Sequence, residues 1–170
     1  MDTFLRYTHS GLRWVVVAVL IAALLYMLYG WLAKRPWDRR GQILLSAFSG
    51  LVGLQWIVGL VFLVVWGSQT GFGIRHYWEH LFAQTLALAV AHLHYMWRRR
   101  EMADVVRYRN NFLAVLGTFG LIFVGILALP ETMRWRLSPG ATTAAVEAST
   151  DEAADPDAEL EATPENTPEG

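Results

Sequence analysis

The chain has 170 residues, of which 54% are hydrophobic and 17% are charged, and its mean hydropathy is +0.30. It contains no cysteine, which excludes disulfides, iron–sulfur clusters, thiol catalysis and covalently attached c-type haem. All 14 basic residues and six acidic residues lie before residue 138, whereas nine acidic residues and no basic residue follow. Histidine, carboxylate and tyrosine side chains are left as the candidates for chemistry.

Four apolar stretches predict membrane-spanning helices. A helix crosses the hydrocarbon with about 20 apolar residues, and the stretches that qualify are residues 12–33, 43–66, 78–97 and 112–129. The first is too long for a signal peptide and ends without a small-residue cleavage site, so we expect it to be retained. Because the connections are short, residues 1–137 are expected to form an all-α integral membrane domain, an up-down-up-down bundle of four transmembrane helices.

The segment after the last apolar stretch has a different composition. Residues 138–170 are rich in Ala, Thr, Glu, Asp and Pro and offer almost nothing to bury. Such a segment cannot offset its ordering entropy, so the sequence predicts a disordered acidic C-terminal tail.

The charges of the connections predict the orientation. The connections after the first and third stretches carry nine basic residues, whereas the middle connection carries only Arg75. The positive-inside bias therefore places the first and third connections in the cytoplasm and both termini outside a plasma (inner) membrane. Arg6 and Arg13 weaken this bias near the N-terminus but do not reverse it. The expected partner is the lipid bilayer, not nucleic acid.

The third apolar stretch has one small, polar face. At about 100° per residue, the bulky side chains fall outside the sector of His80, and His92 also points elsewhere. A small face suits either a neighbouring helix that approaches closely or a flat ligand. The residues of this face are His76, His80, Ala83, Gln84, Ala87, Ala91 and His94.

Histidines at bilayer depth are costly and often mark function. His9 opens the first stretch and His80 the third, so both are expected at the same outer level. The pair predicts the two axial ligands of one b-type haem, with Arg13 or Arg75 pairing with the haem propionates. His94 lies about 21 Å farther along an ideal helix and has no partner there, so a second haem is not expected. The alternative is a pair of interfacial histidines bonded to lipid headgroups or loop carbonyls.

The segment around His80 also matches a zinc pattern weakly. Residues 76–80 (HYWEH) place two histidines four apart with Glu79 beside the second, as in inverted zinc proteases. No third ligand follows on a folded element, which makes zinc the lesser reading. Glu79 is either a proton relay to a quinone or a carboxylate favoured by the helix N-terminus. Gln55, Trp56 and the glycines of the apolar stretches are expected to serve close helix packing.

Three short motifs carry a family resemblance. Residues 8–14 (THSGLRW), 54–60 (LQWIVGL) and 79–80 (EH) resemble small four-span bacterial membrane proteins labelled cytochrome-b-like, over residues 4–130. The resemblance implies His9 and His80 as haem ligands. Members of that family often carry a histidine two residues before the glutamine, where this chain has Gly53, and this departure also argues against a second haem.

Two functions are therefore expected from the sequence. The first is a haem-b-binding electron-transfer or quinone-linked subunit, which would serve a larger respiratory or photosynthetic membrane complex. The alternative is a cofactor-free scaffold or accessory subunit of a membrane complex. The sequence leaves open whether the chain is an enzyme.

Overall fold

The computed structural model describes residues 2–130. The acidic tail predicted for residues 138–170 lies outside the described residues and stays a prediction.

Five helices make up the described fold, and residues 2–130 contain no strand. They are α1 (Asp2–Leu32), α2 (Arg39–Thr70), α3 (Arg75–Ala91), α4 (Leu93–Arg98) and α5 (Asp104–Leu127). Three segments are long and apolar enough to cross a membrane, namely Phe4–Leu32, Arg39–Gln69 and Asp104–Leu127. The all-α class and these three candidate spans are confirmed. The helices begin earlier than predicted, α1 at Asp2 instead of residue 12 and α5 at Asp104 instead of residue 112.

The predicted third span, residues 78–97, is not one continuous helix. His92 separates α3 from α4, and its backbone N–H is shared between the carbonyls of Leu88 and Ala89. The N–H of Tyr95 then donates to the carbonyl of His92, 3.1 Å away, and not to that of Ala91. The prediction of a single helix here was wrong, because hydropathy does not register a change in the hydrogen-bond ladder.

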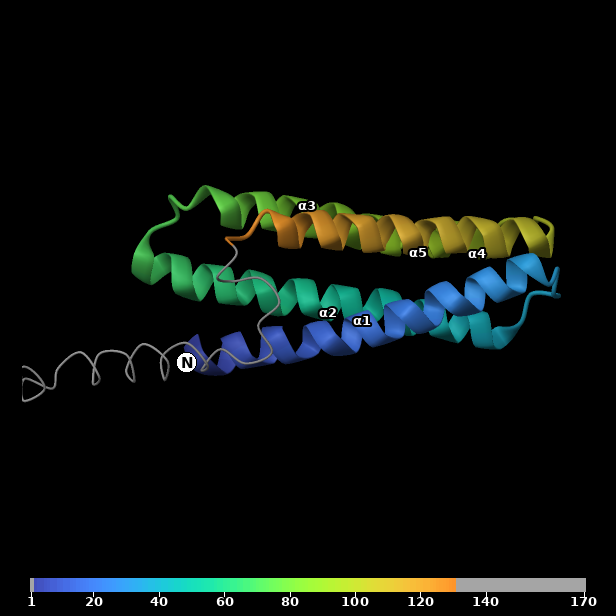
Figure 1. The fold of residues 1–170 in the computed structure, drawn as a ribbon, viewed down its shortest axis with the longest axis horizontal. Coiled ribbons are helices and arrows are strands. Elements are labelled where there is room, and N and C mark those ends of the chain that lie inside the picture. The colour runs from blue at the N-terminus through green and yellow to red at the C-terminus, as the bar shows by residue number, and fades with distance from the viewer. Residues whose placement is uncertain (1, 131–170) are drawn as a thin grey trace, which may run out of the picture. The chain divides into compact units, whose positions relative to one another are not determined.

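The helices pack as two antiparallel layers. Contacts join α1 to α2 and α3 to α5 within the layers, and α1 to α5 and α2 to α3 between them. Figure 1 shows the α1–α2 hairpin along one side of this helical unit and α3, α4 and α5 along the other. Consecutive helices therefore lie side by side, as short connections require.

The apolar core occupies only one half of the bundle. It lies toward the end where α1 passes into α2, and it brings together Val16, Leu20, Ala23, Met27, Leu45, Phe48, Val52, Ala91, Tyr108 and Val115. Toward the other end no side chain of residues 4–15 in α1, or of residues 53–66 in α2, is buried. The two layers diverge toward that end (Figure 1). The half of the bundle that holds His9 is therefore the loosely packed half.

Polar bonds fix the connection between α1 and α2. Asp38 caps α2 by accepting a bond from the N–H of Gly41 at 2.8 Å, and the Tyr26 hydroxyl donates to its other oxygen. Burial opposes ionisation of Asp38, but these two bonds and the charges of Arg35 and Arg40 outweigh it and hold the pKa of the carboxyl below its usual value. Asp38 is thus an ionised anchor that ties the start of α2 to the end of α1.

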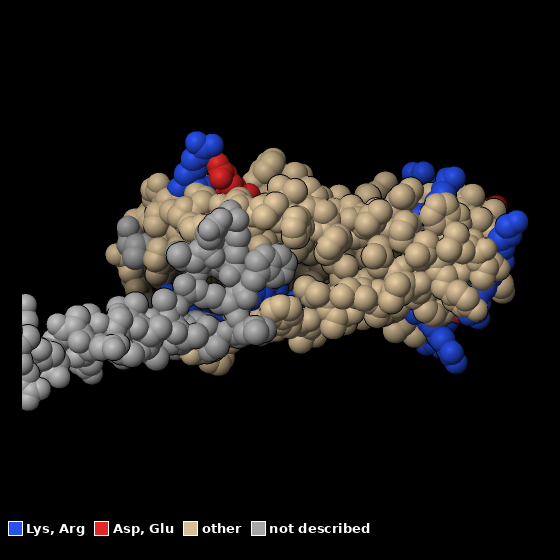
Figure 2. Space-filling model, viewed as in Figure 1, with Lys and Arg blue, Asp and Glu red and all other residues tan. Residues whose placement is uncertain are grey.

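The surface between the ends of the helices is apolar. In Figure 2 the blue and red side chains of the visible face gather near the two ends of the helices, and the middle is tan. This apolar band is what contact with a lipid bilayer requires. Large apolar side chains on the exposed surface include Leu25, Ile57, Val61, Phe82, Leu86 and Phe123.

Candidate functional site

Polar side chains from three helices meet in the loosely packed half of the bundle. His9 and Arg13 come from α1, Gln55 from α2, and His80 and Gln84 from α3. Each of these side chains is half-buried. His80 and Arg13 lie close enough to His9 to interact with it electrostatically. His9 and His80 therefore come from separate helices at the same end of the bundle, and their pairing as ligands stays a prediction.

His80 is oriented by a backbone carbonyl of α5. Its Nδ1 lies 2.7 Å from the carbonyl oxygen of Gly125. Because a carbonyl only accepts, Nδ1 must carry the ring proton, and Nε2 then keeps its lone pair when the ring is neutral. Histidines that bind metals are typically held in this way, with the second nitrogen bonded to a carbonyl or carboxylate. His80 therefore has the tautomer that a metal ligand needs.

His9 lies between Gln55 and Gly59 of α2. The amide Nε2 of Gln55 donates to the backbone carbonyl of His9 at 3.0 Å and lies 3.2 and 3.3 Å from the two ring nitrogens. A Cβ at Gly59 would come within 2.8 Å of the His9 ring carbon Cε1. The glycine thus leaves the space that the imidazole occupies, and the glutamine ties it to α2.

The two arginines proposed as propionate partners lie in different surroundings. Arg13 is half-buried, approaches the hydroxyl of Ser10 at 3.5 Å and acts electrostatically on both His9 and His80. Arg75 is on the surface, where its Nε forms an ion pair with Glu79 at 2.6 Å and its side chain is 90% exposed. Only Arg13 is placed beside the histidines.

The small face of α3 packs against α5. Ala83, Ala87 and Ala91 are buried, and Gln84 donates to the carbonyl of Ile122 at 3.3 Å. A Cβ at Gly125 would lie 3.1 Å from the Cβ of Ala83. Of the two readings of this face, the close neighbouring helix is therefore the one that the fold shows.

The zinc reading gains no support from the described residues. Residues 2–130 bring together no group of three or more His, Asp or Glu side chains able to hold a metal ion. Glu79 is engaged with Arg75, and the ring of His76 packs against Tyr77 at 4.3 Å between centroids. A haem needs only two axial ligands from the protein, so this finding does not bear on the haem prediction.

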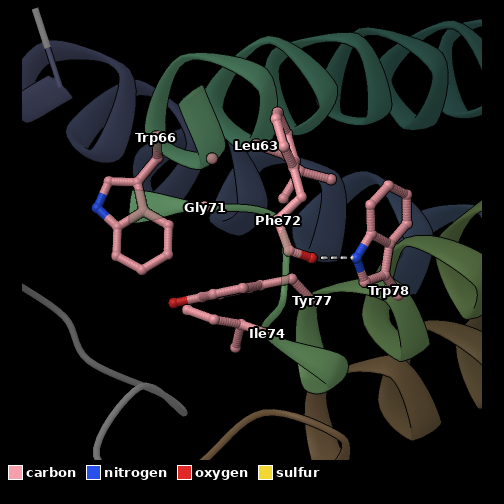
Figure 3. Close-up of a pocket in the computed structure, with 8 residues that line it drawn as sticks. Leu63, Trp66, Gly71, Phe72, Ile74, Tyr77 and Trp78 are labelled. Carbon is pink, nitrogen blue, oxygen red and sulfur yellow. Dashed lines mark hydrogen bonds between the residues drawn. The ribbon is translucent and has the colours of Figure 1, made fainter. Parts of the chain in front are cut away.

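Aromatic rings close the connection between α2 and α3 (Figure 3). Trp66 and Tyr77 meet edge to face at 5.1 Å, and the indole N–H of Trp78 donates to the carbonyl of Phe72 at 2.8 Å. The cavity that these rings surround measures about 10 Å³, which is room for about one water. The cluster is therefore a packed cap on this end of the bundle, of the kind that Trp and Tyr form at a membrane interface. The cavity is lined by Leu63, Trp66, Gly67, Gly71, Phe72, Ile74, Tyr77 and Trp78.

Comparison with known proteins gives no match. No family model, no curated protein and no solved structure is similar to this chain.

Two members of the site were not predicted from the sequence. Gln55 was expected to serve helix packing, and the structure bonds it to His9 instead. Its place inside an apolar span was a signal, since a lone amide at that depth needs a partner. Nothing in the sequence points to the carbonyl of Gly125, because every residue has a backbone carbonyl. Only the packing of α3 on α5 brings this one to His80.

Proposed function

We propose that this chain is a membrane subunit that binds one haem b between His9 and His80 and serves electron transfer or a quinone-linked reaction. The observation that carries the proposal is the bond between His80 Nδ1 and the carbonyl of Gly125, which leaves Nε2 for iron. When bound, haem b would supply reversible one-electron chemistry.

The chain's own residues have distinct roles in this proposal. His80 is held by α5 and is ready to ligate. The amide of Gln55 contacts both the ring and the backbone carbonyl of His9. To bind iron, the His9 ring would have to give up its contact with the amide, whereas the hydrogen bond from the amide to the His9 carbonyl would remain. Arg13 supplies positive charge beside both rings, as anionic propionates require.

The resemblance to cytochrome-b-like four-span proteins supports the same ligands. Two of its three motifs contain His9, Arg13 and Gln55, and the third ends at His80. These residues lie together in the fold although their motifs are far apart in the chain. Gly53, where family members often carry a histidine, faces Leu88, since a Cβ built there would lie 3.8 Å from the Leu88 side chain, and this is consistent with one haem and not two.

We extend the proposal to a fourth membrane crossing formed by α3 and α4 together. They run from residue 75 to residue 98, and at 1.5 Å per residue they reach about 35 Å, which exceeds a hydrocarbon thickness of about 30 Å. Four crossings place the first and third connections, with their nine basic residues, on the cytoplasmic side and both termini outside.

Ligand substitution tests the haem proposal. His9→Ala and His80→Ala should each abolish low-spin haem, because one imidazole leaves the other axial position open or water-bound. His92→Ala is the matched control, since that exposed ring bonds only locally to the carbonyl of Leu88 at 2.8 Å. Visible spectra of the purified, reduced variants supply the readout. Low-spin haem that survives His80→Ala would overturn the assignment.

The cofactor-free scaffold is the second candidate. It is favoured by the Gln55 amide, which already lies within 3.3 Å of both ring nitrogens of His9. A purified wild-type protein without haem, whose helical content and thermal stability are unchanged when haem is added, would make the scaffold the preferred function.

A further inference from the structure

An open hollow lies on the surface at the end of α4, away from the candidate haem site. It measures about 690 Å³ and is lined by Tyr95, Met96, Arg98 and Arg99. Sites for small molecules typically have volumes of about 300–1,000 Å³, so the hollow is large enough for a ligand. The haem proposal uses none of these four residues.

Two guanidinium groups at the hollow carry positive charge that the protein does not neutralise. Arg98 and Arg99 are exposed, and within residues 2–130 neither side chain has an ion-pair or hydrogen-bond partner. Glu101 and Asp104, the acidic residues that follow in the chain, do not line the hollow. Because a guanidinium binds a phosphate through two parallel hydrogen bonds, the pair favours an anionic ligand that carries a phosphate.

Tyr95 adds a ring that is held in place and a hydroxyl that is available. Its ring packs against that of His94 at 4.0 Å between centroids and stacks on that of His92 at 5.8 Å. His94 is only 3% exposed, so it gives the tyrosine a fixed support. In the part of the chain that the structure describes, the Tyr95 hydroxyl has no hydrogen-bond partner, and it can donate to an oxygen of the ligand.

The hollow joins these polar groups to an apolar surface. Met96 is 55% exposed, and exposed apolar side chains continue along α3 at Leu86 and Phe82. A free phosphate could use only the arginines, whereas a phosphate that carries hydrocarbon could contact both surfaces. Aromatic and basic residues at the end of an apolar helix are also typical of the headgroup level of a bilayer.

We infer that this hollow binds the headgroup of an anionic phospholipid. The phosphate pairs with Arg98 and Arg99, and the Tyr95 hydroxyl donates to a headgroup oxygen. The acyl chains pass Met96 and lie along the exposed face of α3. The inference is independent of the haem proposal, since it needs only α3 and α4 to lie in the bilayer.

Methionine-methyl nuclear magnetic resonance of the full chain tests the site. The protein is placed in nanodiscs in which phosphatidylglycerol progressively replaces phosphatidylcholine. We expect the Met96 methyl signal, identified by its loss in Met96→Leu, to shift and to saturate as the phosphatidylglycerol fraction rises. The signal of Met27, which is fully buried, is the internal reference and should not move.

A pair of double variants separates this site from the general charge of the protein. Arg98→Gln with Arg99→Gln should weaken the response about tenfold or more, because each basic residue near an anionic surface contributes about fivefold to affinity. Lys34→Gln with Arg39→Gln is the matched control. It removes the same charge from exposed residues that do not line the hollow, so the Met96 shift should remain. Circular dichroism checks that both variants keep their helices.

Three results would overturn the inference. A Met96 signal that does not respond to phosphatidylglycerol would exclude the site. An equal loss of the response in the two double variants would show a general attraction of charges and no headgroup site. The same shift on adding inorganic phosphate to phosphatidylcholine nanodiscs would show that the hollow binds a free anion and not a lipid.

Discussion

At the scale of single residues, the candidate site depends on which nitrogen of each histidine is free. His80 has one nitrogen committed to Gly125 and one left for a ligand. His9 has a backbone carbonyl held by Gln55 and a ring that rests in the space above Gly59. The two histidines are therefore supported from helices other than their own, so substitutions on α2 and α5 should act on them.

Gly59→Ala should displace His9 without touching its chemistry. A Cβ at that position would lie 2.8 Å from the His9 ring, so the imidazole must shift by several tenths of an ångström. Haem content, measured as absorbance per protein, should fall at least severalfold if His9 is a ligand. Gly50→Ala on the same helix is the control, because its Cβ would meet nothing within 4 Å. Equal haem content in both variants would argue against ligation by His9.

Asp38 predicts an acid-sensitive connection between α1 and α2. Its pKa lies below the usual value of about 3.9, so the ionised form stabilises the fold above that pH and the contribution is lost as the pH falls through the lowered pKa. The melting temperature in detergent should therefore fall as the pH is lowered below about 4. Asp38→Asn should reduce this acid-dependent fall, and Glu101→Gln, which leaves the bond from Tyr26 in place, should keep it. An identical pH profile in Asp38→Asn would contradict the role.

At the scale of helices, hydropathy located the apolar stretches well, and three of them became long helices. The break at His92 was missed because it depends on one side chain, that of His94, replacing a backbone donor. The sequence also predicted that the small face of α3 meets either a close helix or a flat ligand, but the choice of α5 required the packing of Gly125 on Ala83. For the site, the sequence singled out His9, His80 and Arg13, while the surface position of Arg75 depends on its pairing with Glu79.

The crossing of α1 and α5 should be intolerant of a larger residue at Gly30. A Cβ there would overlap the ring of Tyr108, which is 1% exposed and packs against Trp37 at 4.8 Å between centroids. Because the ring cannot move away freely, Gly30→Ala should destabilise the fold by about 1–3 kcal/mol. Gly11→Ala, with nothing within 4 Å, should leave stability equal or slightly higher. Thermal unfolding in detergent compares the two, and equal melting temperatures would refute this packing.

At the scale of the whole helical unit, one half carries the apolar core and the other carries the polar cluster. Sequence periodicity cannot reveal this division, because exposed large apolar side chains occur in both halves. The proposed haem would lie in the half that contains His9 and His80.

The charge of the connections predicts the topology of this unit. A cysteine introduced at Arg99, in the protein without native cysteine, should react only with reagents that reach the cytoplasm. A cysteine introduced at Gly73, in the connection between α2 and α3, should react from outside and serves as the opposite control. Labelling of both positions from the same side would contradict the crossing formed by α3 and α4.

The visible absorption spectrum of the purified wild-type chain, reduced with dithionite, tests the central claim most directly. The account predicts a split α and β band pattern of a low-spin b-type haem, at a ratio of about one haem per chain, because two neutral imidazoles complete the iron's coordination. A spectrum without these bands, from protein made in cells that supply haem and still helical by circular dichroism, would contradict it.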